Sequence, residues 1–141
     1  MKRTATAKWK GSLKDGSGTI SAPSGIFSNV PYNTPGRFET GTGTSPEELI
    51  PAAHASCFAM ALSAELGKLG ITPDTIDAQA TVSLDKQAAG WAVTASHLEV
   101  TATIPGGDRA KFQQAADTAK AGCPISKLLK AEVTLEAKLV A

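Results

Sequence analysis

The sequence contains few aromatic residues, few cysteines and no excess of charge of either sign. Phe, Trp and Tyr make up 5% of the 141 residues, so we expect a core built mainly from small and aliphatic side chains. The 14 basic and 13 acidic side chains give a formal net charge of +1, which argues against a nucleic-acid-binding protein, because such proteins carry a clear basic excess. A hydrophobic content of 42% excludes a disordered tail, and the length is typical of one domain.

The sequence also lacks an obvious targeting segment. No apolar stretch follows the basic start at Met1, which predicts a cytoplasmic location. The most apolar run, 49–66, contains His54 and Glu65, and we interpret it as too short and too interrupted for a membrane span. Two cysteines in a reducing compartment are not expected to form a permanent structural disulfide. Cys57 and Cys123 are therefore the first candidates for chemistry.

Alternation of apolar and polar residues predicts the strands, and capping residues predict the helices. Ser45, followed by Pro46 and by Glu48 three residues after the serine, is typical of a helix start. Pro51 is expected to kink or break that helix, leaving a short first turn and a long helix over 51–68. Strands are expected at 4–10, 18–22, 77–86, 91–104 and 133–140, a short strand near 36–39, and further helices at 109–121 and 124–129.

This order of elements predicts an α+β fold with long antiparallel strands and two main helices covering one face. We find no internal repeat and no linker, so the interpretation is a single domain over 1–141.

The two cysteines lie in different local settings. Cys57 falls inside the most apolar helix, where it is either a small buried hydrophobic residue or a reactive thiol. Cys123 falls at an expected N-cap, which favours a thiolate, although a small residue at a turn is the simpler interpretation. Their separation of 66 residues excludes a C-x-x-C motif. His54, three residues before Cys57, either packs in the core or acts as a base for the thiol.

Arginine is scarce, with three in the chain against eleven lysines. Arg37 lies in an irregular segment rich in Gly, Pro, Asn and Thr, and a rigid guanidinium there could hold a thiolate or a peroxide oxygen. Glu47 could orient this arginine through a bidentate ion pair. The alternatives are a solvated arginine in a loop and a glutamate that compensates the helix dipole.

Several segments together resemble the OsmC branch of the OsmC/Ohr family. The specific part is the pair of cysteine segments at compatible positions, and one departure is Pro51, where the family has a small residue such as glycine. The matching segments are Arg37-Phe38-Glu39, Thr44–Ile50, Ala52–Leu62, Val82–Lys86 and Ala119–Glu132.

The resemblance implies an intertwined α+β homodimer that reduces organic hydroperoxides, and hydrogen peroxide less well. It implies that Cys57 is the peroxidatic cysteine and Cys123 the resolving cysteine, joined in a disulfide during turnover. Arg37 would stabilise the thiolate and Glu47 would pair with Arg37. The reductant would be a dithiol such as a dihydrolipoyl group on a partner protein. No metal, flavin or other cofactor is expected.

Two other functions remain open from the residues. One is a non-catalytic dimer of the same fold that binds a small molecule or lipid. The other, less favoured, is a thiol or metal sensor that uses Cys57, Cys123 and a histidine. The spacing of these residues fits no zinc pattern.

Overall fold

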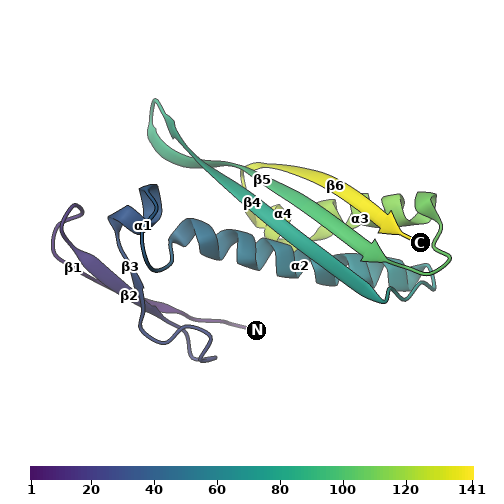
Figure 1. Cartoon of the computed structure of the whole chain (residues 1–141), viewed down its shortest axis with the longest axis horizontal. Coiled ribbons are helices and arrows are strands. Elements are labelled where there is room, and N and C mark those ends of the chain that lie inside the picture. The colour runs from purple at the N-terminus through teal and green to yellow at the C-terminus, as the bar shows by residue number, and fades with distance from the viewer. The chain divides into compact units, whose positions relative to one another are not determined.

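The computed structural model describes all residues from 1 to 141, and the chain separates into two compact units (Figure 1). The first unit is Met1–Leu49 and the second is Ile50–Ala141. The boundary falls inside one helix, between Leu49 and Ile50. The interpretation of 1–141 as a single domain stays a prediction.

The first unit contains a small antiparallel sheet of order β1-β2-β3. Gly18 of β2 pairs with Tyr32 of β3, and a Cβ at position 18 would lie 2.5 Å from the tyrosine ring, so only glycine fits under this ring. Trp9 of β1 completes the cluster, with its ring centroid 5.4 Å from that of Tyr32. The strands are β1 (Thr6–Lys10), β2 (Ser17–Ser21) and β3 (Val30–Tyr32).

The short strand expected near 36–39 is wrong, because this segment forms the helix α1 (Thr34–Phe38). Asn33 is its N-cap, and the Asn33 side chain accepts a hydrogen bond of 2.8 Å from the Gly36 N–H. Pro35 occupies one of the first helical positions, where its missing N–H has no cost. The third strand of the sheet therefore lies earlier, at Val30–Tyr32.

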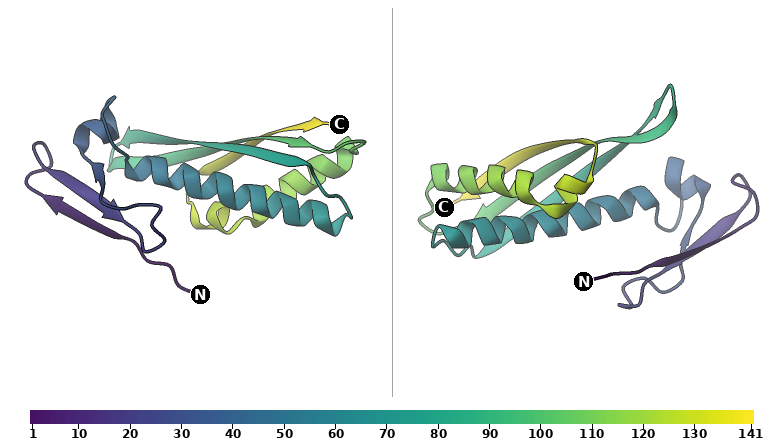
Figure 2. Two further views of the ribbon diagram at one scale, coloured as in Figure 1. Left: turned by 60° about the horizontal axis from the view of Figure 1, so that its bottom comes forward. Right: turned by 180° about the vertical axis from the view of Figure 1, so that it is seen from behind.

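The second unit packs two long helices against one face of a three-stranded sheet (Figures 1 and 2). The α+β class and the two main helices on one face are as predicted from the sequence. The elements are α2 (Pro46–Lys68, whose first residues belong to the first unit), β4 (Thr75–Gln87), β5 (Gly90–Thr103), α3 (Arg109–Gly122), α4 (Pro124–Leu128) and β6 (Glu132–Val140).

The sheet order is β4-β5-β6, and the last strand departs from the antiparallel expectation. β4 and β5 form an antiparallel hairpin, whereas β6 runs parallel to β5 over Glu132–Val140. The chain leaves β5, passes through α3 and α4 along one face, and returns in the same direction. Such a helical crossover produces a parallel pair, and alternation of residues along a strand does not reveal its direction.

The core lies between this sheet and the two helices. The inward row of β5 is fully or almost fully buried, as are the residues of α2 and α3 that face it. Burial of one Leu or Phe side chain contributes roughly 1.5–3 kcal/mol, so this layer holds the second unit together. Its main members are Phe58, Leu62, Leu66, Leu98, Val100, Ala102, Ile104, Phe112, Ala115, Ala116, Ala119 and Cys123.

α2 begins as predicted but is not broken at Pro51. The Ser45 hydroxyl accepts a hydrogen bond from the Glu48 N–H, while the Glu48 carboxylate accepts one from the Thr44 hydroxyl instead of closing the capping box. Pro51 lies near the start of the helix, so only the hydrogen bond to the Glu47 carbonyl is lost and the helix continues to Lys68.

α2 is also longer and more apolar than we expect from the sequence, where the run 49–66 is interpreted as too short and too interrupted for a membrane span. At 23 residues, with a mean hydropathy of 1.3, it is long and apolar enough by these two measures to cross a membrane. The argument that the run is too short is therefore wrong. In the structure one face of this helix, with His54, Phe58, Leu62 and Leu66, is buried, and 22% of its most apolar window is buried.

Candidate active site

Cys57 and Cys123 meet in the second unit although 66 residues separate them. Cys57 lies on α2, and Cys123 is the residue between α3 and α4. Their Sγ atoms are 2.9 Å apart and share a hydrogen bond, and both thiols are free. This separation is within about 1 Å of a disulfide bond, so a small shift would join them. Cys57 is partly exposed, whereas Cys123 is completely buried.

The pKa values of the two thiols are shifted in opposite directions. Burial raises the pKa of the Cys57 thiol, and the hydrogen bond with Cys123 raises it further, against a smaller lowering by the Ile125 N–H. Burial also acts to raise the pKa of Cys123, but hydrogen bonds from the Cys57 thiol and from Ser126 and Ile125 outweigh it, so this pKa lies below its ordinary value.

His54 is fully buried one turn before Cys57, but it does not bond to Cys57. Its Nδ1 lies 2.7 Å from the Ser96 Oγ, and its Nε2 lies 2.8 Å from the Ser126 Oγ. Burial lowers the pKa of His54, which favours the neutral imidazole. The idea of His54 as a direct base for Cys57 is not supported by this geometry, and both ring nitrogens that a metal would need are already occupied.

The sequence analysis does not identify Ser96 or Ser126 as site residues, although the position of each in the sequence indicates a polar contact. Ser96 occupies an inward position of β5, in the row that continues with Leu98, and a polar residue in an apolar row needs a buried partner. Ser126 follows Cys123 by three residues at the start of a helix, a spacing that brings a side chain back toward the N-cap.

Arg37 and Glu47 form the bidentate ion pair that the sequence suggested. The Arg37 Nε and Nη2 atoms donate to the Glu47 carboxylate at distances from 2.8 to 3.2 Å. The guanidinium also lies over the Phe38 ring, 5.2 Å from its centroid. α1 presents Arg37 in its last turn, and α2 presents Glu47 in its first turn. These bonds fix the plane of the guanidinium and leave Nη1 directed elsewhere.

An apolar pocket of about 260 Å³ lies beside this ion pair in the first unit. Trp9, Leu13, Tyr32 and Pro46 supply most of its apolar wall, and Arg37 supplies a charged group at its edge. Such a combination suits a ligand with an apolar body and a polar end.

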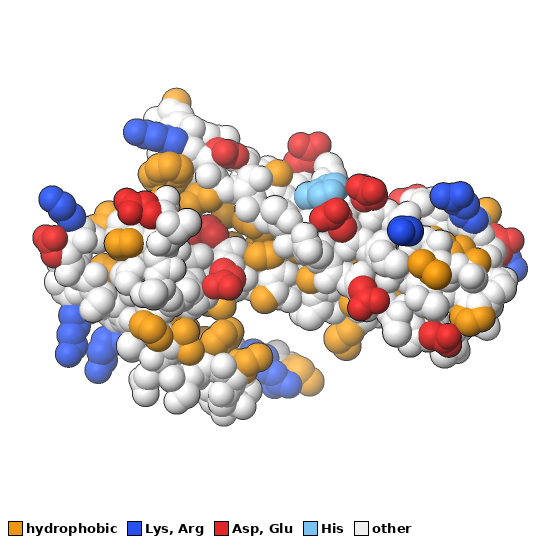
Figure 3. Space-filling view, viewed as in Figure 1, with side chains coloured by type: hydrophobic (Ala, Val, Ile, Leu, Met, Phe, Trp, Pro, Cys, Tyr) orange, Lys and Arg blue, Asp and Glu red, His pale blue; other side chains and the backbone are white.

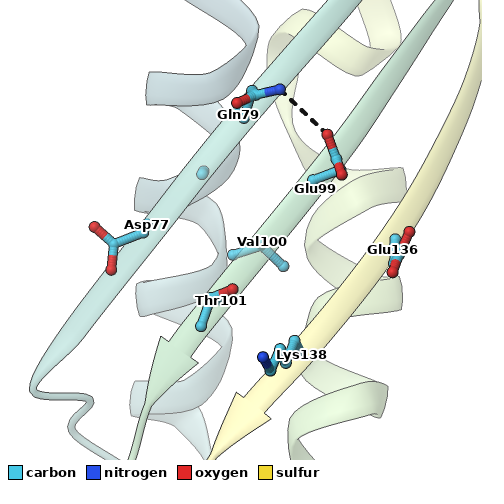
Figure 4. A pocket seen from close by; sticks show the side chains of 8 residues that line it. Asp77, Gln79, Glu99, Val100, Thr101, Glu136 and Lys138 are labelled. Carbon is cyan, nitrogen blue, oxygen red and sulfur yellow. Dashed lines mark hydrogen bonds between the residues drawn. The ribbon is translucent and has the colours of Figure 1, made fainter.

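A larger hollow of about 560 Å³ lies on the outer face of the β4-β5-β6 sheet, the face away from the helices (Figure 4). Gln79 donates a hydrogen bond to Glu99 there. His97, Glu99 and Glu136 bring their ligand atoms within 4.8 Å of one another, and Figure 3 shows a histidine among carboxylates on this face. The carboxylates are exposed, and Lys138 in the same hollow disfavours a cation. These features are those of a solvated sheet face.

Comparison with known proteins relates most of the chain to one family. The family model described as "OsmC-like protein" matches residues 39–138. "Peroxiredoxin OsmC" of Escherichia coli (strain K12) is 51% identical over 133 residues, which cover 94% of this chain and 93% of that protein.

Solved structures agree with this relationship. The crystal structure of the organic hydroperoxide resistance protein OhrB of Bacillus subtilis has a TM-score of 0.69 at 26% identity, and the match covers 97% of this chain and 98% of the other. An OsmC-like protein from Mycoplasma pneumoniae has a TM-score of 0.77 at 16% identity, covering 100% and 99%, which supports the fold alone. The chain belongs to the OsmC-like protein family.

Proposed function

We propose that this protein is a thiol-dependent peroxidase that reduces organic hydroperoxides, and hydrogen peroxide less well. The observation that carries the proposal is the pair of free thiols 2.9 Å apart in a chain of the OsmC-like family. The similarity to a protein named peroxiredoxin and to proteins named for organic hydroperoxide resistance supports it.

Cys57 is the thiol that meets the peroxide, because it is partly exposed while Cys123 is buried. The Cys57 thiolate attacks one peroxide oxygen, the O–O bond breaks, and an alcohol or water leaves. Cys57 then carries a sulfenic acid, which Cys123 converts to a disulfide with release of water. An external dithiol restores both thiols by exchange. We propose a dihydrolipoyl group on a partner protein as this reductant.

The Cys57 thiolate requires a positive neighbour, since burial raises the pKa of this thiol. We propose Arg37 for this role, oriented by Glu47 and supplied by the same chain or by a second copy. The apolar pocket beside Arg37 supports the preference for organic hydroperoxides, because it suits an alkyl or aryl group.

A homodimer completes the proposal. The side of α2 that faces away from the sheet carries small and apolar residues that are exposed, and Met60 is 76% exposed. Small residues at this spacing allow a second helix to approach closely. The exposed residues are Ala52, Ala53, Ser56, Met60, Ser63, Ala64 and Gly67.

We also propose a cytoplasmic location, where the thiols return to the reduced state.

The test is the consumption of cumene hydroperoxide by wild type, Cys57→Ser and Cys123→Ser in the presence of dithiothreitol. Cys57→Ser should lose turnover completely. Cys123→Ser should lose sustained turnover through the disulfide but should still form one sulfenic acid per chain, because the attacking thiol remains. A Cys57→Ser protein that turns over at the wild-type rate would overturn the proposal.

Thiol counting separates this function from the binding alternative. One equivalent of hydroperoxide, added to reduced wild type without other thiols, should remove two thiols per chain together. A non-catalytic dimer that binds small molecules or lipids would retain both thiols.

A further inference from the structure

Two side-chain hydrogen bonds join α2 to the short segment that begins at Cys123. The Sγ atoms of Cys57 and Cys123 are 2.9 Å apart, and the His54 Nε2 atom lies 2.8 Å from the Ser126 Oγ. On each segment the two contacts are three residues apart, which is about 4.5 Å along a helix axis. Two contacts at this spacing fix both how α4 slides along α2 and how it turns against it (Figure 2).

α4 is otherwise weakly attached to the second unit. It is a helix of five residues, Pro124–Leu128, and none of them is fully buried. Ile125 packs partly against the core, and the half-buried Ser126 gives the helix a directional bond to a neighbouring element. The position of Cys123, which is the N-cap residue of α4, therefore depends on the contact between Ser126 and His54.

The His54 ring is itself held from its other side. Its Nδ1 lies 2.7 Å from the Ser96 Oγ on β5, and both residues are completely buried. A serine hydroxyl can donate or accept, so both contacts are satisfied with either tautomer of the neutral ring. The two serines occupy both ring nitrogens, so His54 acts on Cys123 through Ser126 and not by a bond to the sulfur.

The contact between His54 and Ser126 does not depend on the oxidation state of the cysteines. Oxidation of Cys57 adds an oxygen atom to its sulfur, so the direct contact between the two sulfurs has to rearrange. The second contact contains neither sulfur and is available to hold Cys123 in place while Cys57 carries the sulfenic acid. Such alignment matters, because a displacement of about 1 Å between reacting groups can slow a reaction about a hundred-fold.

We propose that His54, supported by Ser96, is a positioning residue that holds Ser126 and thereby keeps Cys123 within reach of the oxidised Cys57. This inference rests on the proposed function and concerns its second step, disulfide formation. In this step Cys123 Sγ forms a bond to Cys57 Sγ, and the S–O bond of the sulfenic acid breaks with its electron pair on oxygen. The departing hydroxide takes up the proton that Cys123 has lost, so water is the product and no further oxidant is consumed.

The test follows the two oxidation steps separately in single turnover. Reduced protein is mixed with one equivalent of cumene hydroperoxide, and the sulfenic acid (trapped with dimedone) and the remaining free thiols are followed over time. Ser126→Ala should form the sulfenic acid at the wild-type rate but the disulfide about three-fold to ten-fold more slowly, as expected for loss of one hydrogen bond between neutral groups. Ser126→Thr keeps the hydroxyl and should restore most of the rate of disulfide formation.

A double-mutant cycle tests whether Ser126 acts through His54. His54→Leu should slow disulfide formation at least as much as Ser126→Ala, because it removes the other end of the same contact and the link to β5. Adding Ser126→Ala to His54→Leu should then slow the step no further. The control is Thr118→Ala, which removes an exposed hydroxyl bonded to the Gln114 carbonyl of its own helix and should change neither step.

Three results would overturn the inference. The first is disulfide formation at the wild-type rate in Ser126→Ala, and the second is an equal slowing of both steps in that variant, which would indicate a general loss of structure. The third is an equal effect of Ser126→Ala with and without His54, which would show that the serine acts through another group.

The variants of Ser126 leave the His54 ring in place, so they remain informative if His54→Leu fails to fold. Failure of the proposed function is distinguishable, because wild type itself would then form neither sulfenic acid nor disulfide.

Discussion

His54 couples the stability of the second unit to pH. The groups that face its ring nitrogens are the hydroxyls of Ser96 and Ser126, which do not titrate in the range of an imidazole. Burial holds the pKa of His54 below its ordinary value. Protonation would place a donor at both nitrogens, so that the oxygens of both serines would have to accept. The folded state therefore disfavours the imidazolium.

The first prediction at this scale is a loss of stability in mild acid. The unfolded imidazole binds its proton near pH 6.5, whereas the folded one binds it only at lower pH. The unfolded state thus holds more protons in this window, so the free energy of unfolding is highest above about 6.5 and decreases as the pH falls below it. Urea unfolding of the reduced protein at about pH 7.5 and 5.5 measures the difference.

His54→Gln is the control for this pH dependence, because its amide does not titrate. Its free energy of unfolding should change less between the two pH values than that of wild type. An identical decrease in both proteins would assign the effect to other groups and contradict the prediction.

The guanidinium of Arg37 leads to the second prediction. If it stabilises the Cys57 thiolate, Arg37→Ala should lower the second-order rate constant for oxidation of Cys57 by about ten-fold or more, as expected for loss of a charge-assisted hydrogen bond. Arg37→Lys should recover only part of the rate, because an ammonium lacks the planar fork that Glu47 orients. Rapid mixing with hydroperoxide measures the rate constant.

The matched control is Arg109→Ala, which removes an exposed arginine at the start of α3 and should leave the rate constant unchanged. Equal rate constants for Arg37→Ala and wild type would exclude Arg37 from the first step.

The site residues differ in how far the sequence reveals them. The cysteines and Arg37 are recognisable because cysteine and arginine are scarce here and chemically distinctive, and Glu47 is recognisable by its place at a helix start. Ser96 and Ser126 belong to a common residue type, and their role depends on contacts over 42 and 72 positions with His54. The sequence alone does not specify such long-range contacts.

At the scale of elements, local signals predict the helices and strands better than their arrangement. The starts of α2 and α3 are decided within a few residues, and the structure places them where the sequence indicates; the Asp108 side chain caps α3 by accepting a hydrogen bond from the Lys111 N–H. The direction of β6 and the formation of α1 are not predicted by these local signals. β6 becomes parallel because two helices intervene, and α1 forms because Asn33 caps a segment whose glycine and proline content suggests an irregular loop.

Pro51 illustrates how tertiary packing changes a local rule. An interior proline typically costs about 3 kcal/mol in a helix. Here the four buried side chains of α2, His54, Phe58, Leu62 and Leu66, lie after the proline at intervals of four residues. Their packing against the sheet fixes the helix on the C-terminal side, and only the first turn precedes the lost hydrogen bond. One continuous helix therefore carries both Glu47 and Cys57.

The whole molecule leaves an apolar helix largely uncovered. Only 22% of the most apolar window of α2 is buried, and Met60 is among the most exposed large hydrophobic side chains. An exposed apolar face on the central helix is costly in water unless another surface covers it. A second copy of the chain is the occupant that we propose, because a partner's Arg37 could then complete the site.

The prediction is a homodimer in solution. Light scattering coupled to size-exclusion chromatography should give twice the chain mass of 14.4 kDa for wild type. Met60→Glu should shift the mass toward one chain, since it places a carboxylate in the covered face. Val140→Glu adds the same charge at an exposed site on β6 and should remain a dimer. A monomeric wild type, or dimers in all three proteins, would show that this face of α2 does not hold two chains together.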